Sequence, residues 1–232
     1  MPVHGKNGRV YIDEFDVTGF ANSISLDTSV DLSDITTMAN NGKKYLEGLK
    51  DATMAIEGIY DGDKDTIDNT LNEIKTGEAL YSYYPALDTK GNVGYSFKGL
   101  RSASATQASI TESVNFSLAT QTTEGTERVK SITPKVTIEE DGSTSSLDLS
   151  AAGTDGAVIY LHVFDVDGEI DVIIEDSADN TAFDTLTATT DINAPGAYRI
   201  EVSGEVRQYV RVTVSGLGMS ETVTLQTGIK VN

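Results

Sequence analysis

Cysteine is absent from the sequence, and histidine occurs only twice, at positions 4 and 162. Without cysteine the protein has no disulfide bonds, no thiolate metal sites and no cysteine nucleophile, so we expect its stability to come from packing and assembly. His162 lies within residues 157–166, a run that is apolar on both faces of an expected strand. We therefore expect His162 to be buried and hydrogen-bonded rather than catalytic, and we expect no enzymatic activity and no cofactor.

Basic residues are few, because 17 lysines and arginines stand against 36 aspartates and glutamates, a formal net charge of -19. Tight non-specific DNA binding needs several clustered cationic side chains that displace counterions from the phosphates. The charge therefore argues against binding to nucleic acid or to anionic membranes. Two interpretations remain open: the acidity provides solubility or adaptation to a salty environment, or it suits a surface that lets DNA pass without sticking.

Long hydrophobic runs are also missing. No apolar run approaches the roughly 20 residues that span a bilayer, and residues 1–15 lack the apolar core of a signal peptide. We expect neither a membrane partner nor an encoded export step. A chain of 232 residues has room for one large β domain or for two of ordinary size, and we expect two.

The chain is organised around residues 16–62, where two strand-like segments flank a polar connection. From residue 23 to residue 33 polar and apolar side chains alternate, the period of two that predicts a strand with one solvent-exposed face. From residue 51 to residue 61 the outer face is partly apolar, which predicts a strand with neighbours on both faces. On the polar face of the first strand we expect Ser25, Asp27, Ser29 and Asp31.

The connection between these strands, residues 34–50, carries more apolar surface than a free linker would. We expect it to dock onto another surface, such as a second copy of the chain. Aromatic and aliphatic side chains carry most of the energy of a contact of this kind. The candidate contact residues are Ile35, Met38, Tyr45, Leu46 and Leu49.

One helix is predicted, over residues 65–76, because apolar residues recur at helical spacing between a capping aspartate and a terminal glycine. About three turns are marginal alone, so its apolar stripe needs a sheet to pack on. Further strands are expected at residues 79–84, 95–100 and 114–119. Helix and strands together predict an α+β unit that ends near residue 130.

The second half of the chain has an almost pure β pattern. The doubly apolar run at 157–166 indicates a central strand, and Asp167-Gly168 predicts a tight hairpin turn into a strand at 170–174. Several further short strands separated by turn residues predict a β-sandwich. We therefore expect two domains, residues 1–130 and residues 131–232.

Two groups of closely spaced carboxylates resemble metal sites, but the pattern of each has a different explanation. The first lacks the glycine and the glutamate that an EF-hand calcium loop requires, so helix capping is favoured. The second follows the spacing of two that marks the solvated face of a strand. We expect no metal at either group. The first comprises Asp61, Asp63, Asp65 and Asp68, and the second comprises Asp165, Asp167, Glu169 and Asp171.

The order of these elements resembles the major tail tube protein of long-tailed, noncontractile phages. The resemblance rests on residues 10–20, on the alternating strand up to Val30, and on the segments KKYLEGLKD at 43–51 and ATMAIEGIYDG at 52–62. The second half, from YLHV at 160–163 to RQYVR at 207–211, is similar to the β-sandwich often appended to those proteins. The likeness is a diffuse pattern that covers nearly the whole chain.

The resemblance implies a mainly β fold, with an N-terminal tail-tube-type β-sandwich or barrel that includes one α-helix. A C-terminal Ig-like or jelly-roll-like β-sandwich would follow as an outer decoration domain. The implied role is structural: hexameric rings stack into the virion tail tube, through which DNA passes without specific binding. Assembly would take place in the host cytoplasm, with other tail proteins, including terminator and initiator proteins, as partners.

In such a tube the connection at residues 34–50 would reach a neighbouring subunit or ring, and the polar strand face would line the lumen. Closure of the sheet into a barrel would remove exposed strand edges. An alternative function, suggested by the second sandwich and its loops, is a surface adhesion or carbohydrate-binding module. As part of a virion, that domain could still make weak contact with the host surface.

Overall fold

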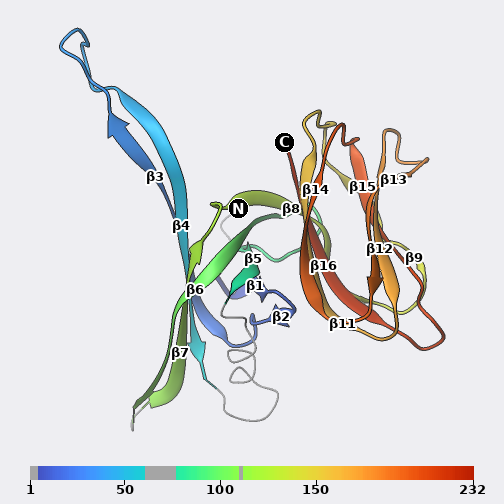
Figure 1. The fold of residues 1–232 in the computed structure, drawn as a ribbon. Helices are drawn as coiled ribbons and strands as arrows, with labels where there is room; N and C mark the ends of the chain where they lie inside the picture. Colours follow the sequence, from blue (N-terminus) through green and yellow to red (C-terminus); the bar gives the residue numbers. More distant parts are fainter. Residues whose placement is uncertain (1–4, 61–76, 110–111) are drawn as a thin grey trace. The chain divides into compact units, whose positions relative to one another are not determined.

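The computed structural model describes residues 5–60, 77–109 and 112–232 (Figure 1). Strands account for 65% of the described residues, which confirms the mainly β class. The helix predicted over residues 65–76 lies outside the described residues. A short 3-10 helix, η1 (Gly5–Asn7), precedes the first strand. No helix in the described ranges combines the length and the hydrophobicity needed to cross a bilayer.

The chain divides into two compact units. The sandwich unit comprises residues 5–18, 80–96 and 127–232, and the hairpin unit comprises residues 19–60, 77–79, 97–109 and 112–126. This division differs from the expected one into residues 1–130 and 131–232. The physical reason is non-local strand pairing: residues 93–96, for example, pair with residues 127–130 in the sandwich unit.

The sandwich unit contains two antiparallel sheets. The first has the strand order β14-β11-β16-β8-β6-β5-β1-β2, and the second has the order β10-β15-β12-β13 with β9 beside β15. The first sheet comprises β1 (Arg9–Ile12), β2 (Phe15–Asp16), β5 (Glu78–Tyr84), β6 (Val93–Ser109), β8 (Glu127–Ile138), β11 (Ala157–Val166), β14 (Gly196–Val202) and β16 (Val223–Val231). The second comprises β9 (Gly142–Ser143), β10 (Leu147–Asp148), β12 (Ile170–Ser177), β13 (Asp184–Ile192) and β15 (Tyr209–Ser215). Only the first residues of β6 belong to this unit.

An aliphatic core fills the space between the two sheets. Alternate residues of facing strands, such as Ile159 and Leu161 of β11 and Val172 and Ile174 of β12, are buried there. A second cluster lies on the opposite face of β11. Its buried members are Tyr11, Leu80, Tyr84, Val129, Val158 and Tyr160. Because β1 and β5 are far from β11 in the strand order, the first sheet must curl to bring these side chains together.

The turn at Asp167-Gly168 connects the two sheets, so the prediction of a hairpin there is wrong. β11 pairs with β14 and β16 in the first sheet, whereas β12 pairs with β13 and β15 in the second. Gly168 has a φ of 84°, a left-handed conformation that glycine adopts without strain. That conformation serves a crossing between sheets as well as a hairpin, so the dipeptide alone does not decide which strands pair.

The hairpin unit is an antiparallel sheet with the strand order β3-β4-β7-β6. It is built from β3 (Ala21–Asp34), β4 (Tyr45–Ile59), β7 (Glu112–Thr122) and the later part of β6. One face is apolar, and it buries Met54 and Ile56 of β4 beside Phe116 and Leu118 of β7. At Gly58 a Cβ atom would lie 2.1 Å from the Phe20 carbonyl oxygen, so only glycine fits this position.

Candidate functional site

β3 and β4 form a long hairpin, and no third strand among the described residues flanks its outer half. β4 pairs with β7 only from Thr53 to Ile59, whereas its pairing with β3 continues to Tyr45 and Asp34. We call residues 30–51 the arm, and in Figure 1 it extends beyond β6 and β7. An isolated two-stranded ribbon is marginally stable in water at best. The arm is therefore suited to gain stability from a contact.

The connection between the two strands is shorter than the expected residues 34–50. β3 ends at Asp34 and β4 begins at Tyr45, so only residues 35–44 form the tip. The strand register shifts where Asp31 faces Gly48 and Leu49, which is a β-bulge. A bulge interrupts the period of two, and this is why the residues before Lys50 show no regular alternation.

Hydrogen bonds define the conformation of the tip. The Ile35 amide donates to the Lys44 carbonyl oxygen at 2.9 Å, and the Lys44 amide donates to Thr36 Oγ1 at 2.8 Å. The Thr36 amide donates to Asp34 Oδ1 at 2.8 Å. Hydrogen bonds from the side chain and the backbone of Thr36 lower the pKa of Asp34. The tip is thus a hydrogen-bonded turn and not a free linker.

Large apolar side chains of the arm face solvent. Exposed fractions reach 109% for Met38, 79% for Leu49 and 59% for Leu46. The structure thus exposes every predicted contact residue, namely Ile35, Met38, Tyr45, Leu46 and Leu49. Val30 and Leu32 are exposed as well. The exposure of these two residues was not predicted, because the alternation of residues 23–33 indicates an apolar strand face but not where the neighbouring strand ends.

The exposed side chains occupy both faces of the arm. Tyr45 pairs with Asp34, and Leu46 pairs with Ser33. Consecutive residues of a strand point to opposite faces, so Tyr45 and Leu46 are presented on different sides. Contiguous apolar groups exposed in this way mark contact sites of soluble proteins. The arm can therefore contact a partner through either face.

The second face of the hairpin sheet is polar. Ser25 pairs with Ala55, Asp27 pairs with Thr53 and Ser29 pairs with Asp51, so these side chains share one face. Asp31 lies at the bulge, and all four residues predicted for the polar face are exposed. β7 continues this face through Asn115, Ser117, Ala119 and Gln121, which pair with residues 59, 57, 55 and 53 of β4. That this face lines a lumen stays a prediction.

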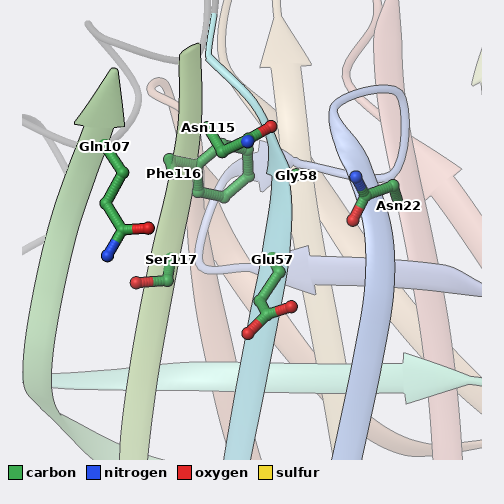
Figure 2. Close-up of a pocket in the computed structure, with 7 residues that line it drawn as sticks. All are labelled: Asn22, Glu57, Gly58, Gln107, Asn115, Phe116 and Ser117. Carbon is green, nitrogen blue, oxygen red and sulfur yellow. The ribbon is translucent and has the colours of Figure 1, made fainter. Parts of the chain in front are cut away.

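A hollow of about 280 Å³ lies on the hairpin unit at this polar face (Figure 2). Figure 2 shows the side chains of Glu57, Gln107 and Ser117 extending from three adjacent strands. The hollow is lined by Asn22, Glu57, Gly58, Gln107, Asn115, Phe116 and Ser117. Amides, a hydroxyl and one carboxylate dominate this lining, which suits a hydrated surface better than an apolar ligand.

Two edges of the hairpin sheet are open. In the described part of the chain β3 pairs only with β4, and residues 102–108 of β6 are exposed throughout. An open edge presents unpaired N–H and C=O groups to which another strand can bind. β6 also neighbours β5 and β8 through its first part, so the edge that it can offer lies at residues 102–108; with the edge of β3, one copy can then offer an edge to each of two neighbours.

His162 is fully buried in the sandwich unit within a chain of hydrogen bonds, which confirms the prediction. Its Nδ1 lies 2.7 Å from the Asp13 carbonyl oxygen, and its Nε2 lies 2.8 Å from Ser82 Oγ. Because a carbonyl oxygen only accepts, Nδ1 carries the proton and Nε2 accepts from Ser82. Ser82 Oγ lies 2.8 Å from Ser96 Oγ, which extends the chain. Burial lowers the pKa of His162 to about 4, although the Asp13 contact opposes the shift.

Ser82 and His162 are far apart in the sequence, so their contact could not be predicted from a sequence pattern. Both side chains have no exposed surface. The Asp13 carboxylate accepts from the Leu80 amide at 2.7 Å, and the imidazole contacts the carbonyl of that aspartate instead. The arrangement therefore lacks the carboxylate that orients a catalytic histidine and the access that a substrate needs. It is a structural hydrogen-bond chain.

We expect the stability of the protein to fall between pH 7 and pH 4 because of His162. An unfolded histidine takes up a proton near pH 6.5, whereas the buried imidazole resists protonation down to about pH 4. Stability that is present above the unfolded pKa is lost as the pH falls toward the folded pKa, by about 3 kcal/mol in total. Urea unfolding at a series of pH values measures the effect.

The matched control is His162→Gln, which keeps a polar side chain and removes the titration. Between pH 6.5 and pH 5 the unfolding free energy of this variant should depend less on pH than that of the parent protein. His4 and the carboxylates are common to both proteins. Equal slopes in the two proteins would contradict the assignment of the pH dependence to His162.

The carboxylate groups considered for metal binding form no site in the described residues. Asp165, Asp167 and Glu169 are exposed, and Asp171 Oδ1 accepts from the Asp191 amide at 3.0 Å. The group at positions 61 to 68 lies outside the described residues. Across residues 5–60, 77–109 and 112–232, no three His, Asp or Glu side chains are grouped so as to hold a metal ion.

The sequence matches no family model and no curated protein. Among solved structures, a chain of the virion of a native gene transfer agent particle aligns with 55% of this chain and 98% of its own, at 13% identity and a TM-score of 0.46. The SPP1 tail tube aligns with 55% of this chain and 78% of its own, at 8% identity and a TM-score of 0.46. The SPP1 Dit protein, a hub adsorption apparatus protein, aligns with 97% of this chain and 99% of its own, at 11% identity and a TM-score of 0.40.

Proposed function

We propose that the chain is a structural subunit of a viral tail, in which hexameric rings stack into a tube for the passage of DNA. The observation that carries this proposal is the arm, a two-stranded ribbon with exposed apolar side chains on both faces. An isolated subunit gains nothing from such a surface. A ring or a stack of rings covers it with neighbouring copies.

Burial of the arm side chains supplies part of the driving force. Burying one Leu or Met side chain is worth about 1.5–3 kcal/mol, so Leu32, Met38 and Leu49 together offer roughly 5–9 kcal/mol. Association costs on the order of 4–15 kcal/mol in lost freedom of motion. One arm contact alone is therefore weak, whereas a subunit held by its arm and by two strand edges is held firmly.

The open edges of β3 and β6 support closure into a ring. A sheet that closes through neighbouring copies leaves no unpaired edge. The inward face of such a barrel would be the polar face with Ser25, Asp27 and Ser29. Its small, polar and acidic side chains offer no cationic cluster to which DNA phosphates could bind. This composition fits a conduit and not a DNA-binding site.

Negative-stain electron microscopy of the purified full-length chain tests the proposal, together with light scattering to count the subunits. We expect rings of six subunits and, at higher concentration, tubes. Monomers that persist up to millimolar concentration would contradict self-assembly, and rings of another symmetry would contradict the hexamer. A resolved ring with Asp27 turned away from the bore would overturn the assignment of the polar face to the lumen.

A further inference from the structure

A small hollow in the sandwich unit combines cationic side chains with an aliphatic lining. Its volume is about 210 Å³, and it is formed by β8, β16 and the segment that follows β10. The lining residues are Arg128, Val129, Lys130, Leu149, Ala151, Ile229, Lys230 and Val231. The hollow is independent of the arm and of the polar face.

Strand register shows which charges can reach the hollow. Lys130 pairs with Ile229, whose side chain belongs to the core between the sheets. Arg128 lies two residues before Lys130 and shares its face, whereas Glu127 points to the opposite face. Lys230 also lies on that opposite face, where its Nζ contacts Glu127 Oε1 at 3.2 Å. Of the three cations that line the hollow, Lys230 is thus paired with Glu127, whereas Arg128 and Lys130 are not.

Glu127, which precedes Arg128 in the sequence, and Asp148, on which the charge of Lys130 acts, already have other partners. Glu127 contacts Tyr160, Arg199 and Lys230. Asp148 Oδ1 accepts from the Ser150 amide at 2.7 Å and from Gln208 Nε2 at 3.0 Å. The charge of Lys130 adds only the weakest of the effects that lower the pKa of Asp148, after its hydrogen bonds with Gln208 and Ser150.

The two cations themselves lack a carboxylate partner. Lys130 Nζ donates to the Leu149 carbonyl oxygen at 3.4 Å, and Arg128 is exposed without a bonded partner in the described part of the chain. In the same unit Lys135, Arg207 and Arg211 each contact an aspartate or glutamate, whereas Lys90 donates to Ser145. In a chain with a net charge of -19, two cations that line this hollow are thus left without a contacting carboxylate.

We propose that this hollow binds a small aliphatic carboxylate. The guanidinium of Arg128 presents two parallel donors that match a carboxylate, and the ammonium of Lys130 adds a second positive charge. Leu149, Ala151 and Val231 line the hollow and form the surface for the aliphatic part. The volume is below the range of about 300–1,000 Å³ of pockets for drug-sized ligands, so a short chain fits and a larger ligand does not.

Titration of the isotope-labelled full-length protein with butyrate, followed by NMR, tests this site. We expect saturable shifts of the amide signals of residues 128–130 and 229–231. Inorganic phosphate should bind at least tenfold more weakly, because it has no aliphatic part. The double variant Arg128→Gln, Lys130→Gln should weaken butyrate binding at least tenfold. The control Lys43→Gln, which removes a charge at the tip of the arm, should leave it unchanged.

The thermal midpoints of the variants establish that they are folded, and Arg128 is exposed, so we expect no loss of fold. Non-saturable shifts, or equal butyrate affinity in the parent protein and the double variant, would overturn the site. Phosphate binding as tight as butyrate binding would overturn the role of the aliphatic lining. None of these outcomes depends on whether the chain forms rings.

Discussion

We expect the variant Leu49→Asp to remain a folded monomer and to form neither rings nor tubes under conditions in which, by our proposal, the parent chain assembles. Leu49 is 79% exposed in the isolated chain, so its replacement removes little that stabilises the monomer. In an assembled contact the new carboxylate would be buried without a partner, at a cost of several kcal/mol. Six such sites in every ring would compound the effect. We expect the same result for Tyr45→Asp.

The matched control for both variants is Asn41→Asp, which adds the same charge at the tip of the arm without removing an apolar group. This control should assemble to within a few-fold of the parent concentration dependence. Circular dichroism and the thermal midpoint report on folding, and electron microscopy reports on assembly. Tubes of normal appearance from Leu49→Asp would refute the role of the arm as the joint between copies.

The second large effect concerns the fragment of residues 131–232, which we expect not to fold. Cutting at residue 130 removes Tyr11, Leu80 and Tyr84, which pack against Val158 and Tyr160. Burial of side chains of this size is worth about 1.5–3 kcal/mol each. The fragment loses several of them, and a whole domain is stable by only about 5–15 kcal/mol.

Polar contacts disappear from the same fragment. His162 loses both Asp13 and Ser82, and Gln226 loses its hydrogen bond of 2.8 Å to the Tyr84 hydroxyl. Each lost hydrogen bond removes a net contribution of about 0.5–1.5 kcal/mol. Far-UV circular dichroism and amide NMR dispersion of the fragment measure the outcome.

A chain that keeps residues 1–18, 80–96 and 127–232 provides the control, with short Gly/Ser linkers in place of the excised segments. Ser96 pairs directly with Glu127, so a short turn can join these residues. We expect this chain to unfold cooperatively. If instead the fragment 131–232 showed the stability of the full chain, the sandwich unit as described here would be wrong.

Local patterns in the sequence predicted the strands well. The alternation in residues 23–33 identified β3, and the doubly apolar run at 157–166 has the same bounds as β11. The burial of His162 followed from its place in that run. Residues 34–50 were expected to dock onto another surface because they carry more apolar side chains than a free linker, and the predicted contact residues among them are exposed in the single chain. All of these features depend on a few neighbouring residues.

Features that depend on distant pairing were not predictable in this way. The bulge at Asp31 and Gly48 depends on how β3 and β4 pair. Because it interrupts the alternation, the first residues of β4 were not predicted to be a strand. Gly168 signals a turn without indicating whether the next strand joins the same sheet. The division into units depends on β1 and β5 joining the sheet of β8, β11 and β16, and no local period encodes that choice.

Charge on the open edge of β3 also decides which strand can bind there. Two β3 edges brought together would place Asp27, Asp31 and Asp34 of one copy near those of another, and like charges across a strand pair are unfavourable. The exposed stretch of β6 from residue 102 to residue 108 carries no charge. We therefore expect pairing between unlike edges to be preferred. In the proposed ring, such head-to-tail contacts would give the ring its polarity and would disfavour the two-fold dimers that stop its growth.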